Sequence, residues 1–263
     1  MAALVVAAAL AGCASTEEPY VERPVHEIYN AAVDLMDSGA HQEAAKQFDE
    51  VERQHPYSVW ATKAQLMAAY AHYQANQYDD AIIAVDRFIQ LHPGNRDIAY
   101  AYYLKALCFY EQISDVSRDQ LNTEQALNTL REVVRRFPDS RYARDAQLKI
   151  DLARDHLAGK EMDIGRYYLR RNELLAAINR FRRVVDNYQT TSHVPEALHR
   201  LTEAYASLGL MEEARKAASV LGHNYPGSQW YSDSYGLVAG GEVPQERRKG
   251  DRSFVARAWD WIF

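Results

Sequence analysis

The sequence predicts an all-α fold, an α-solenoid of about five helix–turn–helix repeats. Three observations support this fold class. The 263 residues are 48% apolar and include 18 tyrosines against only 12 glycines and 8 prolines, which favours amphipathic helices with aromatic packing over loops. A frame that opens with alanine and closes with proline twelve positions later recurs along the chain. Turn-forming residues follow each closing proline, as expected between paired helices.

Five copies of this frame organise the chain. Four of them run from alanine to proline, at residues 44–56, 81–93, 126–138 and 214–226. The fifth begins at Ala177 and has Gln189 where proline is expected, so a different turn is predicted there. Residues that can pack on the same helix face stand four positions after each alanine: Phe48, Val85, Leu130, Phe181 and Ala218. Gly39, Asn76 and Gly209 lie upstream and are predicted to end the preceding helices.

This pattern is identified as the tetratricopeptide repeat, whose unit is about 34 residues long. The copies here are spaced more widely, so each repeat is enlarged. We expect the extra length in a polar loop within residues 111–124, between the helices of the third repeat, and in lengthened helices around residues 152–171. One repeat cannot bury both of its faces, so contacts between neighbours hold the stack together and curve it into a groove. The predicted repeat domain spans residues 25–231.

Residues 1–12 are predicted to be a lipoprotein signal peptide. The apolar run 2–12 is shorter than the roughly 20 residues that span a bilayer, but it fits the hydrophobic core of a secretory signal. Residues 10–13, Leu-Ala-Gly-Cys, resemble the lipobox of bacterial lipoproteins, which makes Cys13 the predicted lipidation site and residues 13–24 an acylated linker. Ala14 favours, by the same resemblance, the periplasmic face of the outer membrane. The alternative is a buried N-terminal helix with an incidental cysteine. A signal peptide should begin with positive charge, but no basic residue precedes Cys13.

Composition and motifs argue against several classes of function. The 30 basic and 36 acidic residues give a formal net charge of -6, which does not favour nucleic-acid binding by counterion release. The histidines and cysteines show no metal-ligand spacing, and no nucleophile elbow or phosphate-binding glycine loop is present. We therefore expect no catalytic residues, no metal and no cofactor, and a protein that is not an enzyme. Cys108 is expected to be a small buried core residue.

Tyrosines mark a candidate peptide groove. The first helix of each pair lines the concave side of this architecture, and those of the second and third repeats carry Tyr70, Tyr73, Tyr100 and Tyr103. A tyrosine ring offers rigid apolar area with a polar tip, which suits an extended peptide. The alternative is that about half of these tyrosines pack between repeats.

A closer resemblance is carried by the lipobox, the short linker and five segments of the repeats, at residues 26–32, 85–93, 97–107, 135–146 and 177–188. Together they resemble the BamD family, lipoproteins of the machinery that folds β-barrels into the bacterial outer membrane. The resemblance implies a scaffold without catalysis. Its C-terminal repeats would bind a POTRA domain of the barrel-forming subunit BamA, its N-terminal repeats would accept unfolded β-barrel clients, and the other lipoproteins of the machinery would be partners.

Two arginines match positions of that family. Arg180, in Asn-Arg-Phe, matches the position that pairs with an acidic residue of the POTRA domain, and Arg87, in Asp-Arg-Phe, matches a further position. The alternatives are an exposed helix charge for Arg180, which contributes little, and a salt bridge to a neighbouring helix for Arg87. The alternative function is a periplasmic repeat adaptor that coordinates peptidoglycan synthesis or envelope constriction.

Residues 232–263 are predicted to form a C-terminal tail that has no match in that family. Glycines and a proline near its start break regular structure. Its last residues fit a short amphipathic docking helix, whose apolar face includes Phe254, Trp259 and Phe263. Because such a helix is too short to be stable alone, we expect it to fold on a partner. A membrane surface and the last repeat are the alternative docking sites.

Overall fold

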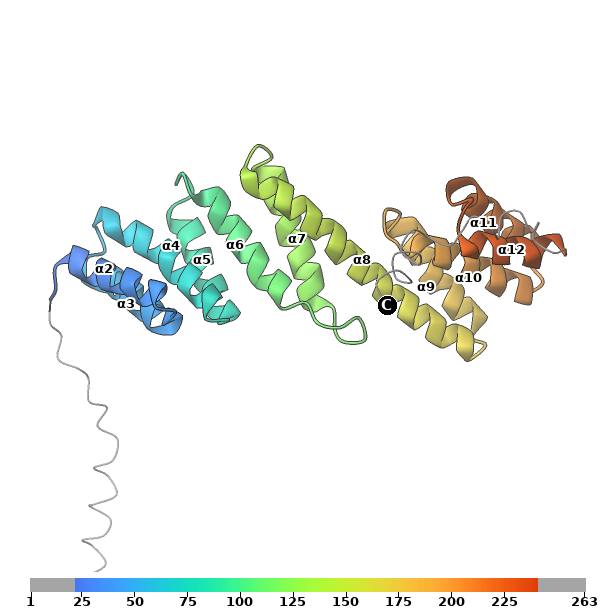
Figure 1. Cartoon of the computed structure of the whole chain (residues 1–263), viewed down its shortest axis with the longest axis horizontal. Helices are drawn as coiled ribbons and strands as arrows, with labels where there is room; N and C mark the ends of the chain where they lie inside the picture. Colours follow the sequence, from blue (N-terminus) through green and yellow to red (C-terminus); the bar gives the residue numbers. More distant parts are fainter. Residues whose placement is uncertain (1–21, 241–263) are drawn as a thin grey trace, which may run out of the picture. The chain divides into compact units, whose positions relative to one another are not determined.

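The computed structural model describes residues 22–240, and all regular structure within this range is helical (Figure 1). The chain divides after Asn76 into two compact units. The first unit contains α2 (Val25–Asp37), α3 (His41–Gln54) and α4 (Val59–Gln74). The second unit contains α5 (Tyr78–Leu91), α6 (Ile98–Glu111), α7 (Leu121–Arg136), α8 (Arg141–Arg170), α9 (Leu174–Asn187), α10 (Val194–Ser207), α11 (Met211–Asn224) and α12 (Gln229–Ala239).

One apolar core holds the first unit together. Ile28 of α2 and Phe48 and Val51 of α3 are buried there with alanines of all three helices. The ring of Tyr29 stands edge-on to Phe48, at 5.4 Å between ring centroids, and to Trp60 of α4, at 4.9 Å. Aromatic pairs in this geometry add about 0.5–1.5 kcal/mol to the burial itself. The alanines allow the helices to approach closely around these rings.

The recurring frame has its predicted structural meaning. Each opening alanine lies in the first two turns of a helix and is fully buried: Ala44, Ala81, Ala126, Ala177 and Ala214. The residues four positions later are buried as well. Each closing proline follows the end of its helix, where a missing backbone N–H does no harm. The all-α fold of helix–turn–helix repeats is therefore confirmed.

The turn at Gln189 does not differ from the others, so the prediction of a different turn is wrong. α9 ends before Tyr188, which adopts φ -126° and ψ 42°, close to the -129° and 51° of His92 after α5. The amide of Thr191 donates to the carbonyl of Tyr188 at 3.0 Å, as the amide of Asn95 donates to that of His92 at 3.0 Å. This residue conformation and this hydrogen bond set the turn, and a proline ring is not required for either.

Left-handed residues end the helices that precede four of the frames. Gly39 (φ 80°), Asn76 (φ 58°) and Gly209 (φ 77°) adopt positive φ at the predicted places. Asn172 (φ 59°) ends α8 in the same way and was not predicted. Glycine reaches this conformation without a Cβ clash, and asparagine tolerates it better than most residues.

The extra length of the repeats lies in the segments expected to hold it. Residues 112–120 join α6 to α7, and α8 has 30 residues, which is about 45 Å at 1.5 Å per residue. Ile150 and Leu157 of α8 pack in a core with α6 and α7, whereas Ala158 and Met162 pack in a second core with α9 and α10. α8 is thus shared by two cores.

α12 corrects the predicted start of the tail at residue 232. The hydroxyl of Ser228 caps this helix, which continues to Ala239. His199 Nδ1 of α10 is hydrogen bonded to Ser234 Oγ of α12 at 2.9 Å, and the His199 ring lies 5.2 Å from that of Trp230. A buried polar pair and a ring contact therefore hold α12 on α10, and the helical domain extends at least to residue 239.

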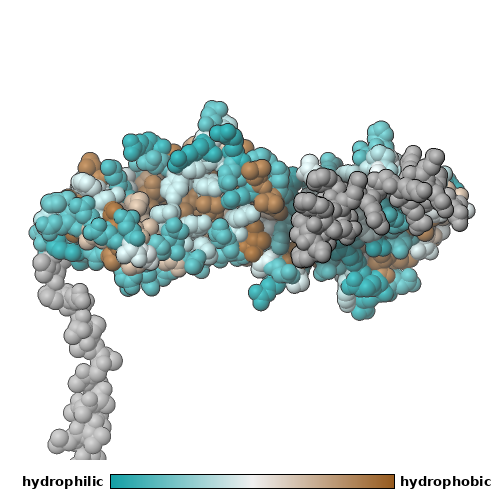
Figure 2. Space-filling model, in the orientation of Figure 1, coloured by the Kyte–Doolittle hydropathy of each residue, from teal (hydrophilic) through white to brown (hydrophobic). Residues whose placement is uncertain are grey.

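The surface is mainly hydrophilic on the face shown in Figure 2, with hydrophobic residues exposed between the polar ones. Leu148 and Leu152 of α8 are 65% and 59% exposed and stand one turn apart. Neither leucine belongs to the two cores in which α8 takes part, so together they form a small exposed apolar strip.

Candidate partner-binding surfaces

Arg180 of α9 belongs to a charge cluster with α8. Its Nη1 donates to Glu161 Oε2 at 3.1 Å, and Arg183, one turn further along α9, donates to Oε1 of the same carboxylate at 3.3 Å. The side chain of Arg180 is 30% exposed and that of Glu161 is 16% exposed. Arg180 is therefore not the isolated exposed charge of the alternative interpretation. Two guanidinium groups share one carboxylate, so the cluster carries a net positive charge at the surface.

A glycine on α8 allows this cluster to form. A Cβ added to Gly165 would lie 2.8 Å from Cδ1 of Phe181, closer than real Cβ contacts, so α8 and α9 approach each other only because the side chain is absent. The buried Phe181 ring fixes the orientation of α9, and this places the preceding Arg180 within reach of Glu161. Sequence reasoning missed Glu161 and Gly165, because contacts between helices depend on packing that no local pattern records.

Arg87 lies on the exposed side of α5, between Asp86 and the buried Phe88. Asp86 accepts a hydrogen bond from Lys105 Nζ of α6 at 2.7 Å, so an ion pair joins α5 to α6 beside it. α5 packs against α6, whereas α9 packs against α8 and α10. The structure therefore places Arg87 and Arg180 in different repeats, and they do not form one site.

Tyr70 and Tyr73 form a pair on α4 in the first unit. Their rings are stacked, with 6.4 Å between centroids and an angle of 23° between planes. The hydroxyl of Tyr70 accepts a hydrogen bond from Gln74 Nε2 at 2.7 Å. Both tyrosines are half-buried, so part of each ring faces solvent, where it can contact another polypeptide.

Tyr100 and Tyr103 of α6 pack against α8 in the second unit. Their ring centroids lie 5.5 and 5.2 Å from that of Tyr142. The hydroxyl of Tyr103 donates to the carboxylate of Asp145, and this hydrogen bond is the main reason why the pKa of Asp145 is lower than usual. These two tyrosines therefore join α6 to α8, which is the packing role that the sequence left open as an alternative.

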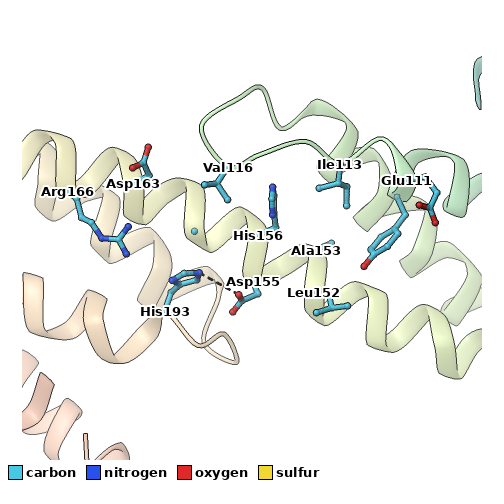
Figure 3. A pocket seen from close by; sticks show the side chains of 12 residues that line it. Glu111, Ile113, Val116, Leu152, Ala153, Asp155, His156, Asp163, Arg166 and His193 are labelled. Atoms are coloured by element: carbon cyan, nitrogen blue, oxygen red, sulfur yellow. Dashed lines mark ion pairs between the residues drawn. The ribbon is translucent and has the colours of Figure 1, made fainter. Parts of the chain in front are cut away.

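A pocket of about 590 Å³, called here the α8 pocket, opens in the second unit (Figure 3). Three segments wall it: the end of α6 with the 112–120 loop, the middle of α8, and the residue before α10. The sequence did not predict this pocket. Its charged and titratable lining residues are Tyr110, Glu111, Asp155, His156, Asp163, Arg166 and His193.

Hydrogen bonds fix both loops that wall the α8 pocket. His156 Nε2 is hydrogen bonded to the carbonyl of Ser114 at 2.6 Å, which ties the 112–120 loop to α8. Asp155 Oδ1 accepts from the amide and the hydroxyl of Ser192 at 2.9 and 2.8 Å, which ties down the loop before α10. The other oxygen of Asp155 lies 3.5 Å from His193 Nε2, the ion pair dashed in Figure 3.

Several predicted sites lie outside the described residues: Cys13, Phe254, Trp259 and Phe263. Within residues 22–240, no group of three or more His, Cys, Asp or Glu side chains is placed to hold a metal ion. No helix in that same range combines the length and the apolar character needed to cross a bilayer. Cys108 is a fully buried free thiol, and burial raises its pKa to about 12.

The fold defines the class of the protein, which is a helical-repeat protein built from packed helix pairs. Among solved structures it is similar to the TPR2AB domain of yeast Sti1, at 11% identity and a TM-score of 0.43 over 82% of each chain. The family described as outer membrane lipoprotein, YfiO, matches residues 21–221, and the chain belongs to this family.

Two relatives are named outer membrane protein assembly factor BamD. The one from Caulobacter vibrioides is 55% identical over 242 residues, which cover 90% of this chain and 79% of the relative. The one from Rickettsia prowazekii is 49% identical over 238 residues, which cover 90% of this chain and 95% of the relative. The resemblance to the BamD family is therefore confirmed.

Proposed function

We propose that the protein is a non-catalytic scaffold of the machinery that assembles β-barrel proteins in the outer membrane. The observation that carries the proposal is the 55% and 49% identity, each over 90% of the chain, to proteins named outer membrane protein assembly factor. Membership of an outer membrane lipoprotein family supports a lipid on Cys13 and a place at the periplasmic face. Packed helix pairs offer extended surfaces to other polypeptides, which supports a binding role.

The experiment is a pull-down of the lipidated protein from membranes. Recovery of BamA, together with other assembly lipoproteins, is the expected result. Recovery of peptidoglycan synthases without BamA would replace this proposal by the alternative of a periplasmic adaptor. Mass spectrometry of the recovered protein tests the lipid on Cys13 in the same sample.

The Arg180 cluster is the proposed contact for an acidic residue of a BamA POTRA domain. Arg180 and Arg183 share the single carboxylate of Glu161, so the cluster can accept a second carboxylate without leaving a charge unpaired. Because Arg180 is partly buried, a partner that covers it also excludes water, and this strengthens the ion pair relative to one at an open surface. Arg87 is a further proposed contact, on a separate repeat.

Reversal of one charge tests this contact. Arg180→Glu is expected to weaken capture of BamA at least tenfold, since it places two carboxylates side by side and repels the partner's acid. Arg53→Glu is the matched control, because Arg53 is also helical and paired, with Glu50 at 2.6 Å, but stands on α3 of the first unit. Equal capture by wild type and Arg180→Glu, in protein of unchanged helix content, would remove Arg180 from the interface.

Tyr70 and Tyr73 are the proposed contacts for the C-terminal strand of unfolded clients. Their partly exposed rings present apolar area beside a hydroxyl, which fits the alternating side chains of an extended strand. The double replacement by alanine should lower the affinity for a client C-terminal peptide. Tyr57→Ala is the control, because Tyr57 is fully exposed in the same unit. If both variants bind the peptide like wild type, clients bind elsewhere.

A further inference from the structure

The α8 pocket has a shape that is fixed before anything binds. Lys160 Nζ donates to the carbonyls of Ser117 and Arg118 at 2.9 and 3.1 Å and so adds a second tie between α8 and the 112–120 loop. A Cβ added to Gly159 would lie 3.2 Å from Nε2 of His193, so this glycine keeps the space between α8 and the loop before α10 open. A ligand therefore meets a preformed hollow, and its binding does not require a loop to be ordered first.

The lining of the α8 pocket is acidic. Glu111, Asp155 and Asp163 place three carboxylates around it. The guanidinium of Arg166 also lines the pocket, but it donates to both oxygens of Glu196 at 2.9 and 2.7 Å. Its charge is thus paired with a carboxylate outside the lining, and Asp155 is paired with His193 inside it, so the carboxylates still outnumber the permanent cations around the pocket. Cationic groups are favoured there.

The lining of the α8 pocket also has apolar parts. Ile113 and Val116 of the loop supply them on either side of His156, and Leu152 supplies a further one from α8 (Figure 3). The exposed strip of Leu152 and Leu148 continues the apolar surface from the pocket along α8. The fitting ligand therefore combines positive charge with a large apolar side chain.

Residues 241–263 of the same chain have this chemistry, and they lie outside the described range. Residues 247–257 contain four arginines and one lysine against a single aspartate, in a chain whose formal net charge is -6. Phe254 stands within this basic segment, and Trp259 follows it. Aromatic and positive side chains thus stand within three positions of each other in the sequence, which is the combination that the lining of the pocket favours.

The connection is long enough. α12 packs on α10, and α10 begins directly after His193 in the pocket wall. The 14 residues of α10 and the 11 of α12 measure about 21 and 16 Å along their axes. The segment from Gly240 to Phe254 can extend about 46 Å, which exceeds both lengths placed end to end. A tether of this kind gives an effective concentration on the order of millimolar.

We propose that residues 247–259 dock in the α8 pocket of their own chain. Phe254 packs against Leu152, and the neighbouring arginines approach Glu111 and Asp163. The pocket changes the expectation drawn from sequence, which was docking on a partner, because complementary charge and apolar surface are present within the second unit itself. The proposal stands independently of the proposed function.

Photocrosslinking in the full-length protein tests this docking. The photoreactive residue p-benzoylphenylalanine replaces Leu152 and, as a matched control, Leu91 of α5, since these leucines are 59% and 58% exposed. The Leu152 variant at micromolar concentration should give a monomeric product in which mass spectrometry finds the crosslink within residues 247–263. The Leu91 variant should give no such product.

Charge reversal provides the second readout. Asp163→Lys should lower the yield of the Leu152 crosslink at least threefold, whereas Asp151→Lys, an exposed position on α8 outside the pocket lining, should not. The proposal is overturned if the Leu152 variant yields no tail crosslink. It is also overturned if the crosslink appears only in dimers, which assigns the pocket to a second copy, or only to lipid or another protein in membranes.

Discussion

Gly165 and Phe181 allow a test of how closely α8 and α9 must pack. Gly165→Ala places a methyl carbon 2.8 Å from Cδ1 of the Phe181 ring, which is fully buried. Overpacking of this kind costs about 1–3 kcal/mol. In a helix interior, alanine is in turn more favourable than glycine by about 1 kcal/mol. We therefore expect Gly165→Ala to lower the free energy of unfolding by up to about 2 kcal/mol, although alanine is the better helix former.

A double-mutant cycle isolates the cause. Phe181→Ala empties a buried ring site and should lower the free energy of unfolding by about 3–5 kcal/mol. In that background the methyl group of Gly165→Ala meets no ring, so the same change should raise the free energy of unfolding by about 1 kcal/mol. The effect of Gly165→Ala should thus differ between the two backgrounds by about 1–3 kcal/mol.

Urea unfolding followed by far-ultraviolet circular dichroism measures these values. Gly227→Ala is the control, because a Cβ there meets nothing within 4 Å, and it should be close to neutral. An effect of Gly165→Ala that is the same in both backgrounds, within about 0.5 kcal/mol, would refute the argument that the Phe181 ring requires a glycine opposite it.

His199 and Asn172 give two further predictions. Burial is the main reason why the pKa of His199 lies below its ordinary value of 6.5. As the pH falls below 6.5, the unfolded chain therefore binds more protons at this residue than the folded chain does, and the free energy of unfolding decreases. His199→Gln should flatten the decline of the melting temperature between about pH 7 and 5, and a decline of unchanged steepness would assign it to other groups. Asn172→Gly should leave the melting temperature unchanged or raise it, whereas Asn172→Ala should lower the free energy of unfolding by about 1 kcal/mol at φ 59°. Equal losses in both variants would contradict this conformational argument.

The repeats could be predicted because their signals are local. An alanine on the core face, a large residue four positions later and a turn after the helix all lie within one helix and its end, and Ala81 and Val85 show this in α5. The same locality explains the error at Gln189. Proline accompanies the turn in four copies, but the conformation of the residue after the helix and one backbone hydrogen bond determine it.

The surfaces could be predicted only in part, because they depend on packing between distant residues. Tyr103 reads from sequence as a groove residue, yet its contact with Asp145, 42 positions away, joins two helices. Glu161 has no signal that would link it to Arg180 before α8 and α9 are packed. The predicted end of the domain at residue 231 is too early for a similar reason, since the contact of His199 with Ser234 holds α12 in place and spans 35 positions.

The single helix α8 also has a mechanical consequence. Its 30 residues enter one core beside α6 and α7 and another beside α9 and α10, without a break in its hydrogen bonds. Weakening either core removes packing from α8, which also takes part in the other core. The second unit should therefore unfold cooperatively instead of one repeat at a time. A force applied to α9 is likewise transmitted through α8 toward α6, so the second unit should keep its shape when a bound protein exerts force on it.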